Sequence, residues 1–210
     1  GRTNKDELTA AQIFYPCMQA ADIWNLKADI AQLGMDQRKV NVLARETFPK
    51  LGLKKPIAIH HHMLMGLTEP KTEGIDSTEA AISKKMSKSN PDSAIFMTDS
   101  KDEIDRKIKK AYCPEGIIKD NPILEYCKYI IFERINEFKI ERPEKFGGNI
   151  VYNNYDSLEK DFAEKRLHPM DLKASCSKYI NELLEPIRKH FEENQNAKRI
   201  QCIVENYAIK

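Results

Sequence analysis

The chain has 210 residues, of which 41% are hydrophobic and 31% are charged, and its net charge is +2. This composition is typical of a soluble globular protein with one large or two modest domains. No hydrophobic run approaches the roughly 20 residues of a membrane-spanning helix, so we expect no membrane partner. Five widely spaced cysteines without a C-x-x-C pair argue against a disulfide framework or a zinc site, and favour a reducing cytoplasm. The small net charge leaves any RNA site to local basic clusters, for which the alternative is a solvated helix face.

The first part of the chain alternates between helix and strand patterns. Hydrophobic residues at helical spacing predict a first helix, with a break or a helix start near Tyr15 because Pro16 lacks a backbone N–H. Period-two alternation that ends at Gly34 predicts a strand followed by a turn. The expected elements are a helix at 8–26, a strand at 28–33, a helix at 36–48 and a strand at 56–60. This order predicts a parallel α/β sheet.

The segment from 68 to 99 is rich in loop-forming residues and shows no period, which is typical of a functional or disordered loop. Beyond it the pattern is helical: Ser100 and Glu103 fit a capping box, and Pro122 suits the first position of a helix. The expected elements are helices that begin at 100 and 121, a strand at 150–152, and helices at 157–165, 169–184 and 186–194. We place the domain boundary near residue 98, which gives domains of residues 1–98 and 99–210.

The sharpest motif lies in this loop and reads Lys85-Met86-Ser87-Lys88-Ser89. It presents two ammonium groups and two hydroxyls on a mobile backbone, a combination that suits a phosphate-bearing polyanion. A lysine that contacts phosphates only in the transition state lowers the barrier without overbinding the substrate. The alternative is a basic surface loop without a catalytic role.

Three polar residues of the first helix share a stripe. Tyr15, Gln19 and Asp22 are spaced i, i+4 and i+7, so on a helix they can converge on one small ligand. The alternative is that Tyr15 and Gln19 pack at the edge of the core, while Asp22 caps a helix or forms a salt bridge.

Three adjacent histidines, His60, His61 and His62, raise the question of a metal site. Successive side chains on a strand point to opposite faces, so three neighbours rarely close on one ion. We therefore expect no metal site here.

Seven segments, in order and at the expected spacing over about residues 12–191, resemble the class I tyrosyl-tRNA synthetases of archaea and eukaryotes. They are 15–22, 34–39, 85–89, 109–116, 142–148, 168–173 and 184–188. Tryptophanyl-tRNA synthetases share the fold and the KMSKS loop, but the octet Tyr-x-x-x-Gln-x-x-Asp argues for tyrosine. The resemblance implies an α/β fold class: the second half of a class I Rossmann-type parallel sheet, with the KMSKS loop, followed by a mainly α-helical anticodon-binding domain.

The resemblance also implies a function. The chain would belong to a cytoplasmic tyrosine–tRNA ligase that activates L-tyrosine with ATP and Mg²⁺, without a tightly bound cofactor, and transfers it to tRNA(Tyr). Asp22 would accept the hydrogen bond of the substrate phenol, and phenylalanine would leave that carboxylate unpaired, which gives discrimination. Tyr15, Gln19 and Gln37 would hold the substrate ammonium.

Further roles follow from the same resemblance. The KMSKS residues expected to act in catalysis are Lys85, Ser87, Lys88 and Ser89. The residues expected to contact ATP are Met63, Leu64, Lys85, Met86, Ser87 and Lys88. His61 and His62 stand where the family usually has Asn-Pro, so the contacts of that segment are expected after them, partly through backbone groups. Arg38 and Lys39 resemble contacts to the tRNA acceptor stem.

On the anticodon side, Phe146 and Asp171 resemble the pair that reads the guanine at the first anticodon position. An exposed aromatic ring can stack on an unpaired base, and a carboxylate can accept from a guanine edge. The pocket would be shaped by His168, Pro169 and Met170. Without the resemblance, Phe146 would be a core residue and Asp171 a charge favoured by the helix dipole.

A class I synthetase also needs a HIGH-type signature, and we find none in this sequence. We therefore expect that the chain alone does not activate tyrosine, and that its exposed sheet edge requires a partner. That partner is expected to be the N-terminal half of the synthetase, and the complete protein a homodimer. One alternative is a non-catalytic, synthetase-derived tRNA/RNA-binding or regulatory module; such a module would be free to lose Tyr15, Gln19, Asp22 and the KMSKS residues, all of which are present. Another is the C-terminal half of a double-length pseudo-dimer chain.

Overall fold

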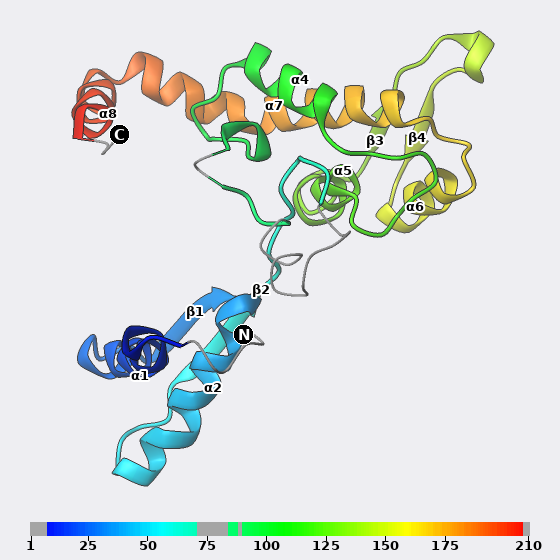
Figure 1. The fold of residues 1–210 in the computed structure, drawn as a ribbon. Helices are drawn as coiled ribbons and strands as arrows, with labels where there is room; N and C mark the ends of the chain where they lie inside the picture. The colour runs from blue at the N-terminus through cyan, green and yellow to red at the C-terminus, as the bar shows by residue number, and fades with distance from the viewer. Residues whose placement is uncertain (1–7, 71–83, 88–89, 208–210) are drawn as a thin grey trace. The chain divides into compact units, whose positions relative to one another are not determined.

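The computed structural model describes residues 8–70, 84–87 and 90–207. The chain divides into two compact units, Gly1–Met63 and Leu64–Lys210 (Figure 1). The described KMSKS residues belong to the second unit, together with the helices that follow them. The functional domain boundary near residue 98 stays a prediction. No helix within the described ranges is long and hydrophobic enough to cross a membrane.

The first unit is a small α/β assembly. Its elements are α1 (Ala10–Asn25), β1 (Ile30–Gly34), η2 (Met35–Gln37), α2 (Arg38–Thr47), η3 (Phe48–Leu51) and β2 (Ile57–His61). The two strands pair in parallel, with Ile30 opposite Ile57, and this confirms the predicted parallel sheet. The buried residues between the helices are Ala20, Ile23, Ala44 and Phe48.

Helix α1 runs without interruption through Pro16, so the predicted break near Tyr15 is wrong. Proline removes one hydrogen bond from the helix. A capping box holds the start of the helix, because the Thr9 hydroxyl accepts from the Gln12 amide and the Gln12 side chain accepts from the Thr9 amide. Beyond the proline, burial of Ala20 and Ile23 keeps the last turns in place.

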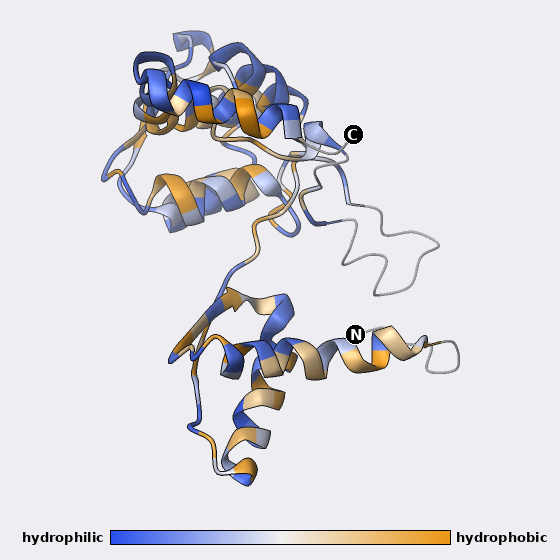
Figure 2. Ribbon diagram, turned by 90° about the vertical axis from the view of Figure 1, so that its left-hand side faces the viewer, coloured by the Kyte–Doolittle hydropathy of each residue, from blue (hydrophilic) through white to orange (hydrophobic). Residues whose placement is uncertain are grey.

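The first unit has hydrophobic segments, coloured orange in Figure 2, and several of its large hydrophobic side chains are exposed. On one face of the sheet Ile30, Ile57 and Ile59 are exposed, and on α1 so are Phe14 and Met18. Parallel strands normally lie in larger sheets that are covered on both faces. This unit therefore has the exposed surface of a partial sheet.

The second unit is mainly helical. Its elements are η4 (Pro91–Ser93), α4 (Lys101–Lys110), α5 (Pro122–Tyr126), the π-helix η5 (Cys127–Ile131), β3 (Phe138–Ile140), η6 (Glu144–Phe146), β4 (Ile150–Tyr152), α6 (Tyr155–Ala163), α7 (Pro169–Glu193) and α8 (Gln195–Tyr207). Helix α4 packs along α7 (Figure 1). The predicted strand at 150–152 is confirmed, and it pairs antiparallel with β3, which was not predicted.

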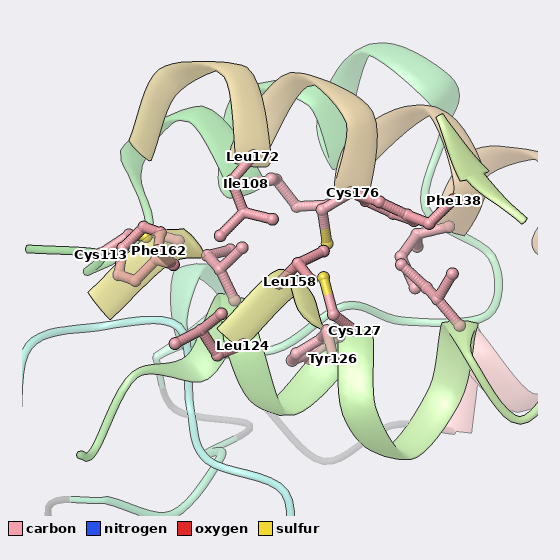
Figure 3. Packing of buried hydrophobic residues seen from close by; sticks show 14 of the residues in the cluster. Ile108, Cys113, Leu124, Tyr126, Cys127, Phe138, Leu158, Phe162, Leu172 and Cys176 are labelled. Carbon is pink, nitrogen blue, oxygen red and sulfur yellow. The ribbon is translucent and has the colours of Figure 1, made fainter. Parts of the chain in front are cut away.

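The core of this unit is a continuous hydrophobic cluster in which Ile108, Leu158, Phe162 and Leu172 are fully buried (Figure 3). Two cysteines, Cys127 of η5 and Cys176 of α7, point their sulfurs toward each other within it (Figure 3). Burial raises the pKa of the Cys127 thiol well above its ordinary value. The Cys127 thiol therefore stays protonated and packs as a small hydrophobic group.

Helix α7 is continuous through Pro186, whereas two helices, at 169–184 and 186–194, were predicted. Arg188 adds contacts within this part of the helix, because its guanidinium donates to the carbonyl and the side-chain oxygen of Asn181 at 2.8 and 3.2 Å. At the start of α4, Ser100 caps the helix as predicted. The carboxylate of Glu103 pairs with Arg106 and not with the cap.

Replacing Leu158 tests the core. We expect Leu158→Ala to lower the free energy of unfolding by about 2–5 kcal/mol, because it removes buried methyl groups and leaves a cavity. Val151→Ala, at a position that is 47% exposed, serves as the matched control and should cost well under about 1 kcal/mol. Urea unfolding followed by helical circular dichroism measures both. Equal losses for the two variants would contradict the core assignment.

Candidate active site

The structure brings two of the predicted tyrosine-binding residues together. The side-chain amide of Gln19, on α1, donates a hydrogen bond to the side-chain oxygen of Gln37 at 3.0 Å. Gln37 closes η2, directly after β1, and its own amide donates to Asp36 at 3.1 Å. Residues 18 positions apart in the sequence therefore form one polar pair at the carboxyl end of β1.

The side-chain oxygen of Gln19 differs from that of Gln37, which accepts a hydrogen bond. The Oε1 atom of Gln19 is buried, and it has no hydrogen-bond partner among the described residues. A buried acceptor without a donor costs about 1–3 kcal/mol, so such groups often mark a binding site. A ligand that brings N–H donors would satisfy this oxygen.

Tyr15 and Asp22 lie on the same helix as Gln19, as their spacing predicts. The Tyr15 side chain is 62% exposed, so it is not part of the core. It borders an open depression of about 510 Å³. Asp22 is also exposed. The roles of both residues in binding stay predictions.

The side chains of His60 and His61 have different surroundings, as expected for neighbours on a strand. His60 faces α2, where its Nε2 atom lies 3.0 Å from the side-chain nitrogen of Asn41. His61 is exposed, and its Nδ1 atom contacts the carbonyl of His62 at 3.1 Å. Among the described residues, no three His, Cys, Asp or Glu side chains could hold one metal ion.

The end of β1 also positions a predicted ATP contact and the predicted acceptor-stem residues. A Cβ atom on Gly34 would lie 2.2 Å from the sulfur of Met63, so Met63 packs where only glycine leaves room. Arg38 and Lys39 occupy the first turn of α2, and both are exposed. Their predicted contacts with tRNA stay predictions.

In the second unit, two stretches of chain lead into and out of the KMSKS segment, and we call them its stems. Both stems are hydrogen-bonded to residues 65–67. Gly66 donates its amide to the Lys84 carbonyl at 2.8 Å, and Leu67 donates its amide to the Ser93 carbonyl at 2.9 Å. A Cβ atom on Gly66 would lie 3.2 Å from the Lys85 carbonyl oxygen and 3.3 Å from that of Ser93. The two stems therefore converge on a glycine that has no side chain to separate them.

The segment itself is partly described, and Lys88 and Ser89 lie outside the described residues. The buried hydroxyl of Ser93 accepts from the amide of Ser87 at 2.9 Å and donates to the Asn90 carbonyl at 2.7 Å. Met86 packs against the hydrophobic core, whereas Lys85 is exposed. The half-buried Leu64 begins this unit. The described part of the motif is thus fixed by the hydrogen bond of Ser87 and the packing of Met86.

Phe146 stands at the end of η6, where its side chain is 60% exposed. The alternative that Phe146 belongs to the core is therefore wrong. Gly147 and Gly148 follow with φ values of +97° and +70°, a left-handed conformation that glycine adopts readily. The Lys145 ammonium lies 4.9 Å from the centre of the Phe146 ring. An exposed ring beside a cation suits an anionic, aromatic ligand.

Arg142 connects this turn with the start of α7. Its guanidinium donates to the Gly148 carbonyl at 2.7 Å and to the Arg166 carbonyl at 3.2 Å. Two residues further on, the Nδ1 atom of His168 accepts from the Met170 amide at 3.1 Å, which makes His168 the N-cap of α7. The predicted anticodon residues are thus tied together through Arg142.

The first turn of α7 then presents the remaining predicted residues. Pro169 is buried as its first residue, Met170 is 47% exposed, and Asp171 is half-buried. The N-terminal end of the helix dipole favours the negative charge of Asp171. This alternative explanation of Asp171 is compatible with a role in binding.

The family model described as "tRNA synthetases class I (W and Y)" matches residues 1–185. The chain belongs to this family. Its similarity extends to tyrosine–tRNA ligase 1, cytoplasmic, of Arabidopsis thaliana, with 49% identity over 100% of this chain and 51% of the relative. Similarity to the tyrosine–tRNA ligase of Saccharolobus solfataricus is 46% identity over 91% of this chain and 54% of the relative. The chain therefore spans about half the length of these curated relatives.

Solved structures show the same relationship. The chain matches a tyrosyl-tRNA synthetase from Pyrococcus horikoshii, complexed with L-tyrosine, with a TM-score of 0.80 and 44% identity over 95% of this chain and 57% of that one. A tryptophanyl-tRNA synthetase from Encephalitozoon cuniculi shares the fold at a TM-score of 0.55 and 20% identity, over 92% of this chain and 49% of that one. The predicted fold class of the second half of a class I synthetase is thereby confirmed.

Sequence reasoning overlooked residues that support this synthetase site. Ser93 carries no signal in the sequence, because its hydroxyl matters only once the chain has turned back toward Ser87. Arg142 could have been found, since it opens the matched segment that contains Phe146 and two glycines. The basic cluster at 107–110 was one for which a solvated helix face was the alternative, but Lys107 is buried.

Proposed function

We propose that this chain is part of a tyrosine–tRNA ligase and supplies part of its active site and its anticodon-binding domain. The complete enzyme would activate L-tyrosine with ATP and transfer the tyrosyl group to tRNA(Tyr). The observation that supports this most directly is the pairing of Gln19 with Gln37, which leaves one buried oxygen of Gln19 for a ligand donor. A free amino acid carries such a donor in its ammonium group.

In this proposal the helix α1 holds the amino acid. Gln19, Gln37 and the Tyr15 hydroxyl offer oxygen acceptors to the ammonium group without adding formal charge. Asp22, two turns along the same face from Tyr15, accepts from the substrate phenol. Phenylalanine would leave the Asp22 carboxylate without that donor, so the enzyme would reject it.

The KMSKS segment would act on ATP. The tyrosine carboxylate attacks the α-phosphorus, the tyrosyl-adenylate bond forms, and pyrophosphate leaves with the electron pair of the broken P–O bond. Lys85 and Lys88 would neutralise the charge that develops on the phosphates, and Ser87 and Ser89 would donate hydrogen bonds. Met63, Leu64 and Met86 would line the ATP site. ATP would enter as its Mg²⁺ complex, with the ion held by phosphate oxygens.

The second unit would read tRNA(Tyr). The exposed Phe146 ring would stack on the guanine at the first anticodon position, and Asp171 would accept from its Watson–Crick edge. Arg142 would keep these two residues at a fixed separation. Arg38 and Lys39 would contact the acceptor stem.

A partner polypeptide, continuous with this chain or separate from it, would complete the sheet. The exposed isoleucines of β1 and β2 support this, because a two-stranded parallel sheet needs a cover. We propose that the partner is the N-terminal half of the synthetase, with the HIGH-type signature, and that the complete protein is a cytoplasmic homodimer. A non-catalytic RNA-binding module would have no use for the open Gln19 acceptor.

Tyrosine-dependent ATP–pyrophosphate exchange tests the division of the active site. The isolated 210-residue chain should show no turnover, because the phosphate-binding residues of the partner are missing. Addition of the completing polypeptide should restore exchange with tyrosine but not with phenylalanine. Robust exchange by the isolated chain would refute the proposed split.

Gln19→Ala tests the amino-acid pocket in the completed protein. It should raise KM for tyrosine about 10–100-fold, because a hydrogen bond to a charged group contributes about 1.5–3 kcal/mol. Gln32→Ala, at an exposed glutamine of β1, is the matched control and should leave KM unchanged. The assignment fails when both variants bind tyrosine as the unchanged protein does.

Phe146→Ala tests the anticodon contact. Loss of stacking should lower kcat/KM for aminoacylation of tRNA(Tyr) by about 5–100-fold, equivalent to about 1–3 kcal/mol, and leave pyrophosphate exchange unchanged. Tyr129→Ala, at another exposed aromatic residue of the same unit, controls for a general effect. A tRNA that lacks the base at the first anticodon position should show no further loss with Phe146→Ala, because no base remains to stack on the ring. An equal loss with both tRNAs would argue against direct reading of that base.

A further inference from the structure

Three consecutive residues of α4 face two different parts of the second unit. Asp105 faces α7, whereas Arg106 and Lys107 face the chain that leaves the KMSKS segment. This arrangement follows from the helical repeat, because neighbouring residues project about 100° apart. Helix α4 therefore contacts both α7 and the chain at 92–99 that follows the KMSKS segment.

Arg106 binds the first part of the stem that leaves the KMSKS segment. Its guanidinium makes a two-point contact with the carboxylate of Asp92, at 2.6 and 3.2 Å, and also binds Glu103 at 2.9 and 3.0 Å. The hydrogen bond from Arg106 lowers the pKa of the Asp92 carboxyl below its ordinary value. Asp92 precedes Ser93, whose hydroxyl binds the Ser87 amide. The contact at Arg106 thus lies one residue away from the anchor of the KMSKS backbone.

The buried Lys107 binds the second part of the same stem, between residues 94 and 99. Its residue is only 3% exposed, and its ammonium binds the Asp99 carboxylate at 2.6 Å and the Ala94 carbonyl at 3.0 Å. The ammonium also lies 4.7 Å from the centre of the Phe96 ring. A buried ammonium with three partners fixes the path of the chain between residues 94 and 99, because loss of any partner leaves a costly charge.

Asp105 fixes the helix that carries these two residues. Its carboxylate accepts from the Ser177 hydroxyl at 2.6 Å and from the Asn181 side chain at 3.0 Å, and both donors are buried on α7. Helix α4 cannot slide along α7 without breaking these contacts.

We propose that Arg106 and Lys107 are positioning residues for the KMSKS segment, held in place by the contact of Asp105 with α7. This inference rests on the proposed tyrosine–tRNA ligase function. None of the three touches the reacting atoms; they act through Ser93 and the stem. They limit the orientations of Lys85 and Ser87 before the phosphates arrive, so the charge of the transition state meets groups that are already placed.

Variants of the Arg106–Asp92 pair test the proposal in the completed enzyme. This pair is partly exposed, so its loss should leave the fold intact. Arg106→Ala and Asp92→Ala should each lower kcat for tyrosine-dependent pyrophosphate exchange about tenfold, with KM for tyrosine unchanged. The double variant should be no slower than the slower single variant, because both changes remove one contact. Arg106→Lys should recover part of kcat.

Lys101→Ala, at an exposed lysine of the same helix, is the matched control and should leave kcat unchanged. A second measurement, amide hydrogen exchange at Ser87, should show about tenfold faster exchange in Arg106→Ala and Asp92→Ala. Unchanged kcat in the single variants, multiplied losses in the double variant, or unchanged exchange at Ser87 would overturn the proposal. If the completed enzyme without substitutions shows no tyrosine-dependent turnover, the proposed function fails. In that case, amide exchange at Ser87 still decides whether α4 restrains the backbone at Ser87.

Discussion

The buried face of α7 is the constraint on which the second unit depends. Leu172 and Cys176 pack in its core, and Ser177 and Asn181 fix α4 through Asp105. The same helix begins with the residues predicted to read the anticodon. One continuous helix of 25 residues therefore sets the place of the predicted base-reading pocket and, through α4, the stem of the KMSKS segment. The helix continues through Pro186, and Arg188 adds hydrogen bonds to Asn181 in the preceding turns.

The two units use polar groups in different ways. In the second unit, buried polar side chains such as those of Lys107 and Ser93 have partners within the protein, which gives rigidity. In the first unit, Gln19 keeps a buried oxygen without a partner among the described residues. Satisfied groups hold a framework, and an unsatisfied group is available to a ligand. This contrast separates residues that build the proposed enzyme from those that would bind its substrate.

Much of the fold could be predicted from sequence, because its helices and parallel strands have strong local patterns. The break at Pro16 was predicted wrongly, since the packing of Ile23 with its neighbours outweighs one lost hydrogen bond. Strand β3 was missed because three residues are too few to show a period. At the site, the Tyr15–Gln19–Asp22 stripe followed from spacing alone. The position of Gln37 beside Gln19 and the part played by Arg106 depend on long-range contacts that no local pattern records.

The small parallel sheet has a consequence for how this protein must be made. Its exposed isoleucines lie on a two-stranded sheet, and an exposed sheet edge can pair with a second copy of itself. If the proposed N-terminal half completes the sheet, correct assembly would compete kinetically with aggregation. A covalent connection, or synthesis of both segments in close succession, would favour correct pairing by raising the local concentration of the right strand.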